Sequence, residues 1–548
     1  MKIVKRRVVY ALIFSFVFSA ALVFGYQLEE NIYQNGGINI FEIKTWMLIV
    51  ILTVVFALIS YGIFGVIARY EKSKKIDLPN AQKVFYKDKR FWKLCLLFLV
   101  CWTPVFLSAF PGYFIYDARA EWEMVSQGQY TTHHPLLHVL LLGSIIEKIH
   151  SITGSYNEGI ATYIILQMIV IACIFSHIIC RMNAWGVSKL IQRVGIVYLC
   201  VFPTVIMYVL CSTKDVLFSA LLLLALVKVI DYIYGKNAKW KDILSIVIIC
   251  TLAFLFRHNG IYAFVVTAPL WLIVAYQRKK TAGMLAGIIA IIILYVICSY
   301  GLKEITNAQE SGKQEMLSIP IQQMARVYQY DKEGIEQSDL EELYAYIPEE
   351  ALVFYKPVLA DNVKQKFNNS YYLEHTSEFW KLWYRVGKSH ASIYLKAFML
   401  DNYGYWYPYA TLNCYEGNQT RTFVYKDSSY FGYETESPGD RESKIPVLDE
   451  AMRKLSLEIS WQKVPVIRLL FHPAFYFWLF AFALCYQLYQ KRYDLCMIAA
   501  LILFVYATVL LGPAVLVRYV LYFYFGFPLL LALLLEGRLT ESYHYYNI

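Results

Sequence analysis

The sequence predicts an all-α polytopic bundle of about twelve transmembrane helices with a separate extracytoplasmic domain. Of the 548 residues, 58% are hydrophobic, and uncharged apolar runs recur along most of the chain. A helix needs about 20 apolar residues to cross ~30 Å of hydrocarbon, because its backbone must satisfy its own hydrogen bonds there. The runs predict spans at residues 8–25, 46–69, 91–110, 156–181, 194–211, 215–234, 242–257, 259–277, 282–301, 466–490, 494–511 and 514–536.

The charges of the connecting loops predict which side of the membrane each loop lies on. Basic residues gather in the loops at 69–93, 181–193, 236–241, 278–280 and 491–492. Because Lys and Arg are enriched in cytoplasmic loops, we expect a plasma-membrane protein with both termini in the cytoplasm. The stretch 134–150 is also apolar, but a span there would reverse every later loop. An amphipathic or re-entrant helix on the outer surface is therefore expected.

The same topology divides the chain into four parts. Segment 303–465 holds 18 Lys and Arg against 24 Asp and Glu, and we expect it outside as a mostly α or α+β domain. The net charge of +10 is assigned to the cytoplasmic loops, so membrane lipids and not nucleic acids are the expected surroundings. The other parts are 1–90 (two helices and a basic loop), 91–302 (a transmembrane core with a first outer loop at 111–155) and 466–548.

Asp117 is the first candidate for chemistry. It follows the third predicted span, in the run from Pro111 to Asp117 that ends Tyr116-Asp117. A carboxylate directly outside a membrane helix suits a general base or a cation ligand. The alternative is an Asp that caps a helix in an ordinary loop.

The histidines after it form the second candidate. His133 and His134 open the expected surface helix, and His134 and His138 share a helix face at the i, i+4 spacing. This spacing permits a metal, with Asp117 and His134 as candidate ligands of a divalent cation such as Mg²⁺ or Mn²⁺. The histidines can equally donate hydrogen bonds to a phosphate or sugar, or simply lie at the membrane interface.

Three basic residues are expected at a similar outer depth. Lys214 and Asp215 begin the sixth span, and the N-terminus of a helix favours a phosphate. The alternative is a capped helix whose lysine extends its ammonium to the membrane surface. An apolar stretch is interrupted by the tetrad Arg257-His258-Asn259-Gly260. A charged residue at that depth in the membrane is expected to face a cavity. The alternative is an exposed hairpin. Arg518 lies near the outer end of the last span. Lys214, Arg257 and Arg518 together suit a phosphate at the headgroup level, and no nucleotide-binding phosphate loop accompanies them.

The order of these motifs resembles the GT-C superfamily of membrane glycosyltransferases. The matching segments are 111–117, His133-His134-Pro135, Ser212-Thr213-Lys214-Asp215 with Phe218, 257–260 and 319–326. They look like an uncharacterised bacterial family related to protein O-mannosyltransferases and the lipid A aminoarabinose transferases. The two helices before residue 91 are additional, and no Asp-x-Asp pair accompanies Asp117.

The resemblance implies that a sugar moves from a polyprenyl-phosphate donor to an extracytoplasmic acceptor. Asp117 is then the expected general base, and Lys214, Arg257 and Arg518 the donor-phosphate ligands. Tyr116, His133, His134, Asp215, His258 and Asn259 are expected to position the substrate or a cation. Tyr405, Trp406 and Arg326 are expected to bind the acceptor. A transporter or flippase of a lipid-linked or anionic substrate and an extracytoplasmic glycan polymerase or ligase are the alternatives, and the oligomeric state stays open.

Overall fold

The computed structural model describes residues 2–32, 38, 42–73, 88–235, 239–412, 433–458 and 460–535. These residues form helices joined by turns, with isolated β-bridges in place of strands. The predicted all-α class is confirmed for this part of the chain. Most of the basic loop expected at 69–93 lies outside the described residues.

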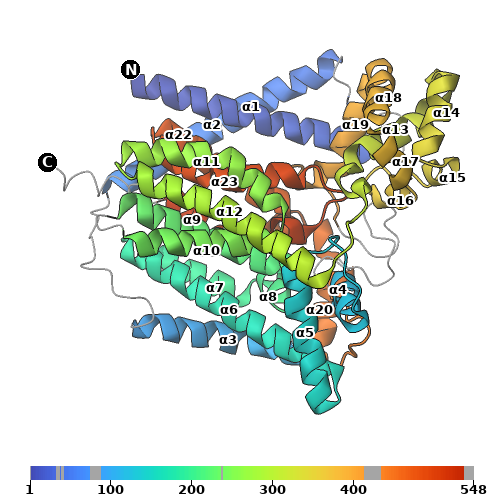
Figure 1. Ribbon diagram of the computed structural model, residues 1–548. Helices are drawn as coiled ribbons and strands as arrows, with labels where there is room; N and C mark the ends of the chain where they lie inside the picture. Colours follow the sequence, from blue (N-terminus) through green and yellow to red (C-terminus); the bar gives the residue numbers. More distant parts are fainter. Residues whose placement is uncertain are drawn as a thin grey trace.

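Long helices lie side by side in one bundle (Figure 1). Their apolar runs drive this packing, with aromatic and branched aliphatic side chains filling one large core and a smaller one that includes Ala11, Phe64 and Tyr486. The bundle contains α1 (Lys2–Glu30), α2 (Ile43–Ser73), α3 (Lys89–Ser108), α6 (Tyr156–Ala184), α7 (Lys189–Val201), α9 (Lys214–Tyr234), α10 (Trp240–Phe256), α11 (Asn259–Gln277), α12 (Thr281–Thr306), α22 (Pro473–Tyr489) and α23 (Tyr493–Val509).

Several predicted spans are broken where the sequence predicted continuous helices. The run 194–211 bends by 57° between α7 and α8 (Pro203–Val209), and 466–490 bends by 73° between α21 (Pro465–Phe471) and α22. Proline begins the second helix of both pairs, because it lacks the amide that a continuous helix needs. The run 514–536 becomes η7 (Val517–Val520), α24 (Leu521–Phe525) and α25 (Phe527–Leu535), with a bend of 46° before α25.

Eight helices are long and apolar enough to cross a membrane, or up to eleven if each bent pair is one span; this count covers the described residues alone. Central and peripheral helices differ in burial: 72% of the most apolar window of α9 is buried, against 22% for α12. The apolar surface left on α12, α1 and α2 suits contact with lipid. The described helices therefore have the length and composition of a multi-pass membrane protein.

One end of the bundle carries additional helices. Figure 1 shows α4 (Tyr116–Gln127), α5 (Leu136–Thr153) and α20 (Pro446–Arg453) gathered there, with α5 inclined steeply to the long helices. α5 is apolar and long enough to count among the eight, but it packs on α4, α6, α10 and α12 at this end. We call this end the Asp117 end.

A helical unit with a core of its own lies beside the same end (Figure 1). It joins the bundle through the Ala360 amide, which donates to the Pro513 carbonyl at 2.9 Å. Its elements are η2 (Lys313–Met316), α13 (Ser318–Asp331), η3 (Lys332–Gly334), α14 (Gln337–Tyr346), α15 (Glu349–Leu352), α16 (Asp361–Lys364), α17 (Asn369–Glu374), α18 (Thr376–Ser389) and α19 (Ala391–Asn402). η4 (Tyr403–Tyr405) follows and packs in the core of the bundle, and η5 (Lys454–Glu458) and η6 (Ser460–Lys463) follow α20.

The opposite end of the bundle is tied by ion pairs between helix termini. Arg181 at the end of α6 contacts Asp231 in the last turn of α9 at 2.6 Å. Arg278 after α11 contacts Asp494 at the start of α23 at 2.7 Å. Since α9 begins with Lys214 at the Asp117 end, Asp231 and Tyr234 lie at the other end, and Tyr234 donates to Asp494 at 2.5 Å. Arg181 and Arg278, from two of the predicted cytoplasmic loops, therefore share that end.

Candidate functional site

The loop before α4 places Asp117 beside the start of α9. The Tyr113 amide donates to the Leu210 carbonyl at 3.0 Å, and the Ser212 amide donates to the Tyr113 carbonyl at 2.9 Å. Gly112 makes this approach possible: its φ is +123°, and a Cβ there would lie 2.8 Å from Ile164 Cγ1. The pairing brings the first turns of α4 and α9 side by side.

Asp117 bridges two cations. Its Oδ2 accepts hydrogen bonds from Arg518 Nη1 at 2.8 Å and from Lys214 Nζ at 3.1 Å, and 15% of its side chain is exposed. Burial alone would raise the pKa of Asp117, but Arg518, Lys214 and His134 together hold it well below its usual range. Asp117 is therefore a stable anion for as long as both cations stay on it.

The Lys214 ammonium lies among groups that a metal would use. Besides Asp117, it contacts His134 Nδ1 at 2.9 Å and Glu121 Oε1 at 3.4 Å. Across the described residues, no three His, Cys, Asp or Glu side chains are grouped as metal ligands. The two predicted metal ligands, Asp117 and His134, thus both bind Lys214. Burial and the Lys214 charge lower the pKa of His134 to about 3, so its ring is neutral.

Glu121 connects this cluster to a buried chain of hydrogen bonds. Its carboxylate contacts His138 Nδ1, whose Nε2 lies 2.7 Å from the Tyr163 hydroxyl. Tyr163 donates to Gln167 at 3.1 Å. Although burial raises the pKa of Glu121, His138 and Lys214 lower it to about 2. Sequence reasoning considered His138 only as a partner of His134 in metal binding and assigned Glu121, Tyr163 and Gln167 no role, although Glu121 follows Asp117 by one helical turn.

Asp215 holds the other two predicted phosphate ligands. Its Oδ1 accepts from Arg257 Nη1, and its Oδ2 lies 3.8 Å from Arg518 Nε. Both guanidinium groups also lie over the Tyr519 ring, at 4.2 Å for Arg257 and 5.4 Å for Arg518. Arg518 donates to the Tyr116 hydroxyl at 2.9 Å, which fixes Tyr116 in the same cluster.

The break between α10 and α11 orients Arg257. Arg257 Nε donates to Asn259 Oδ1 at 3.1 Å, and Asn259 Nδ2 donates to Thr508 Oγ1 at 2.7 Å, so Asn259 ties this turn to α23. His258 instead contacts the Tyr295 hydroxyl on α12 at 2.9 Å through Nδ1. The turn is therefore a packed junction of four helices, α10, α11, α12 and α23, and not an exposed hairpin.

The cluster balances its own charges. The cations Lys214, Arg257 and Arg518 each contact at least one of the carboxylates Asp117, Glu121 and Asp215. Buried charges of this kind require partners, because their desolvation is costly. The three predicted phosphate ligands do converge, but each is already paired with a carboxylate. An incoming phosphate would have to compete with these carboxylates.

The other predicted site residues lie elsewhere. His133 packs its ring on His134 but is half exposed, and it lies 4.0 Å from Glu315. Tyr405 is buried, and its hydroxyl accepts from the Leu516 amide at 2.9 Å, which anchors the loop before Arg518.

Two more of the predicted acceptor residues have structural partners. Trp406 donates to Asn402 at 2.8 Å. Arg326 is fully buried in the helical unit, donates to the Tyr355 hydroxyl at 3.0 Å and lies 4.5 Å from the Tyr330 ring centroid. Tyr405 and Arg326 are buried and present no open surface, and their role in acceptor binding stays a prediction.

Comparison with known proteins adds a family assignment. A family model described as a family of unknown function (DUF6020) matches residues 126–543, which is more than half of the chain. The chain belongs to the DUF6020 family. The DUF6020 match includes Lys214, Asp215, Arg257 and Arg518 and begins after Asp117. No curated protein and no solved structure matches the chain.

Proposed function

We propose that this protein is a GT-C type glycosyltransferase of the plasma membrane. It transfers a sugar from a polyprenyl-phosphate donor to an acceptor of the cell envelope. The observation that carries the proposal is Asp117, a largely buried carboxylate held between Lys214 and Arg518 at the end of an apolar helical bundle. A base beside two cations suits a reaction that deprotonates a hydroxyl and releases a phosphate.

The proposed topology has twelve spans. It counts α10 and α23, which have 17 residues each, and the three bent pairs, but leaves α5 on the outer surface. The Asp117 end and the 303–465 domain then lie outside, and both termini lie in the cytoplasm. The ion pairs of Arg181 and Arg278 at the opposite end support this orientation, because basic residues favour the cytoplasmic side.

In the proposed reaction, the acceptor hydroxyl oxygen attacks the anomeric carbon of the donor sugar. The bond from that carbon to the phosphate oxygen breaks, and its electron pair stays on the departing polyprenyl phosphate. The hydroxyl proton passes to the Asp117 carboxylate. Lys214 and Arg518 stabilise the charge that develops on the phosphate, and Arg257 supports them through Asp215 and the Tyr519 ring.

The paired state of Asp117 gives the donor a second role. While Arg518 and Lys214 contact Asp117, its pKa is too low for an efficient base. A donor phosphate competes for the same two cations, and each contact it takes from Asp117 raises the basicity of that carboxylate. Donor binding therefore activates the base, which stays paired and weakly basic while no donor is bound.

The reaction proposed above runs through no metal. Asp117, Glu121 and His134 all contact the Lys214 ammonium, and across the described residues they are not grouped as metal ligands. The residues present therefore do not fit Mg²⁺ or Mn²⁺, and the charge of Lys214 takes the place of such a cation.

The test is a transfer assay in proteoliposomes with labelled polyprenyl-phosphate hexoses and pentoses. We expect label to pass to a membrane-extracted acceptor with one sugar added per product. Movement of labelled lipid between leaflets without sugar transfer would instead indicate a flippase. Long products would indicate a polymerase. Either result would overturn the proposal.

A further inference from the structure

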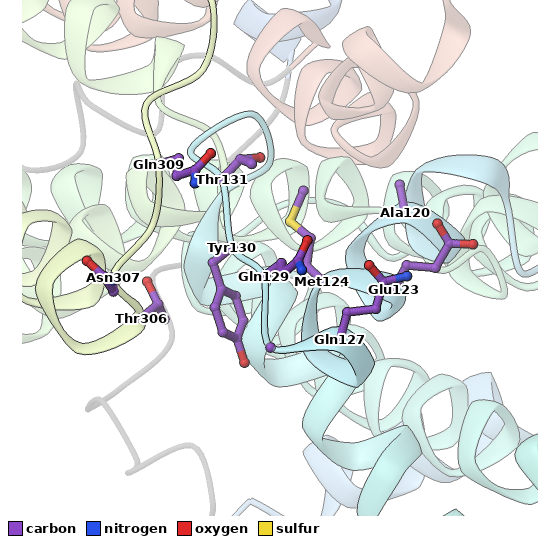
Figure 2. Close-up of a pocket in the computed structure, with 11 residues that line it drawn as sticks. Ala120, Glu123, Met124, Gln127, Gln129, Tyr130, Thr131, Thr306, Asn307 and Gln309 are labelled. Atoms are coloured by element: carbon purple, nitrogen blue, oxygen red, sulfur yellow. The ribbon is translucent and has the colours of Figure 1, made fainter.

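A polar groove opens on the face of α4 next to the Asp117 cluster. It has a volume of about 470 Å³ and lies between α4, the turn at 128–131 and the end of α12. Figure 2 shows Tyr130 and Asn307 on one side of the groove and Gln127 on the other. None of the reaction steps above uses these residues.

Backbone pairing holds the groove walls in place. Gln309 and Tyr130 lie on adjacent segments, joined by a hydrogen bond from the Gln309 amide to the Tyr130 carbonyl at 2.9 Å. The Thr132 amide donates back to the Gln309 carbonyl at 2.9 Å. Gly128 ends α4 with a φ of 65°, which turns the chain toward α12. A preformed wall of this kind reduces the entropy that a ligand must lose on binding.

The lining has the chemistry of a carbohydrate site. Side-chain amides of Gln127, Gln129, Asn307 and Gln309 line it, and each can donate and accept hydrogen bonds as sugar hydroxyls do. The Tyr130 ring adds an apolar face for the C–H surface of a sugar. The one carboxylate of the lining, Glu123, is paired with Arg119 at 2.9 Å, and no cation lines the groove. This composition favours a neutral ligand over an anionic one.

The groove is also close to Asp117 along both elements that form it. Ala120 lines the groove and lies one helical turn from Asp117 on α4. Thr131 lines it as well and precedes His134 of the Lys214 cluster by three residues. A chain molecule bound in the groove can therefore extend one end toward the carboxylate.

We propose that this groove binds the acceptor as a neutral oligosaccharide, with its terminal hydroxyl directed toward Asp117. The inference rests on the proposed transferase function, since it gives that reaction its acceptor class. It replaces Tyr405, Trp406 and Arg326 as the acceptor-binding surface.

The experiment measures binding of soluble oligosaccharides to the full-length protein in detergent. A glycan array of neutral and acidic oligosaccharides selects the tightest neutral binder, which is then titrated by microscale thermophoresis. Tyr130→Ala and the pair Gln127→Leu with Gln309→Leu should each weaken binding about five-fold or more, as expected for lost stacking and hydrogen bonds. The matched control is Tyr384→Ala, an aromatic residue that is 63% exposed on α18, and it should bind as the wild type does.

Two results would overturn the inference: no neutral oligosaccharide binds, or the groove variants bind like Tyr384→Ala. Melting curves identify any groove variant that fails to fold. Gln309→Glu, which keeps the size of the side chain, is then tested in its place. Asp117→Asn separates the two proposals, because it should abolish transfer and leave oligosaccharide binding intact. If the wild type binds oligosaccharides in the groove but transfers no sugar, the proposed transferase function is contradicted. The proposed carbohydrate site would still stand.

Discussion

Arg518 and Asp117 are 401 residues apart in sequence, and Arg518 Nη1 lies 2.8 Å from Asp117 Oδ2. This contact joins the start of α4 to the last helices of the chain. Tyr405 supports this contact, because its hydroxyl forms hydrogen bonds with the backbone of the loop at 514–516 just before Arg518. The cluster therefore depends on parts of the chain that meet only when the whole bundle has formed.

Breaking that pair should destabilise the fold. Arg518→Met leaves Asp117 with Lys214 as its remaining basic partner, and removing one member of a buried pair costs about 3 kcal/mol. Thermal unfolding in detergent measures the loss. Arg119→Met is the control, because the Arg119–Glu123 pair is exposed and should contribute less than about 1 kcal/mol. Equal losses for the two variants would mean that burial of the Asp117 pair has no energetic role.

Lys214 should control the protonation of His134. The pKa of His134 is lowered to about 3 by burial and by the Lys214 charge, while Glu121 opposes the shift. Lys214→Met removes one lowering cause, so the pKa should rise, and Glu121→Gln should move it down. NMR titration of ¹⁵N-labelled histidine reports both. A pKa that stays unchanged in Lys214→Met would show that the ammonium does not contact this ring.

Stability should fall as the pH is lowered, over two windows. Unfolded His134 takes up a proton near its ordinary pKa of 6.5, whereas the folded ring stays neutral to about 3, so stability is lost between these values. Glu121 has a folded pKa of about 2, and its contribution is lost as the pH falls from 4.5 toward 2. Melting temperatures from pH 7 to pH 3 test this. Glu121→Gln should have a flatter profile below pH 4.5, and an identical slope would contradict the prediction.

The Tyr405 hydroxyl should contribute to stability apart from the packing of its ring. Tyr405→Phe keeps the packing but leaves the buried Leu516 amide without its partner, which costs about 1–3 kcal/mol. The altered loop should also misplace Arg518 and slow transfer. Trp406→Phe is the comparison, since it removes one hydrogen bond to Asn402 outside this loop. Wild-type stability in Tyr405→Phe would remove the loop anchor from the account.

The sequence alone was enough to predict the helical class and the convergence of Asp117, Lys214, Arg257 and Arg518. Apolar runs of membrane length predict helices, and alternating basic loops place these four residues at the same helix ends. The charge balance was not predictable, because Glu121 and Asp215 pair with the cations through tertiary contacts that no spacing records. The chain from His138 to Gln167 crosses two helices for the same reason.

Other differences have local physical causes. The bends at Phe202 and His472 follow from Pro203 and Pro473, a signal present in the sequence but outweighed by the apolar runs around it. The aromatic residues Tyr405 and Trp406 were expected to bind the acceptor. Rings of this kind also fill cores, and here Tyr405 is 1% exposed. Burial separates these two interpretations, and composition alone does not report it.

The most direct test of the central claim compares single-turnover transfer by the wild type and by Asp117→Asn at equal donor saturation. The substitution keeps the shape of the side chain and removes the base, and general-base catalysis contributes about 10²–10⁴-fold. We predict a loss of at least about 10²-fold in the transfer rate, with donor affinity retained or increased, because Lys214 and Arg518 remain and the competing carboxylate is gone. Transfer at the wild-type rate would contradict the account.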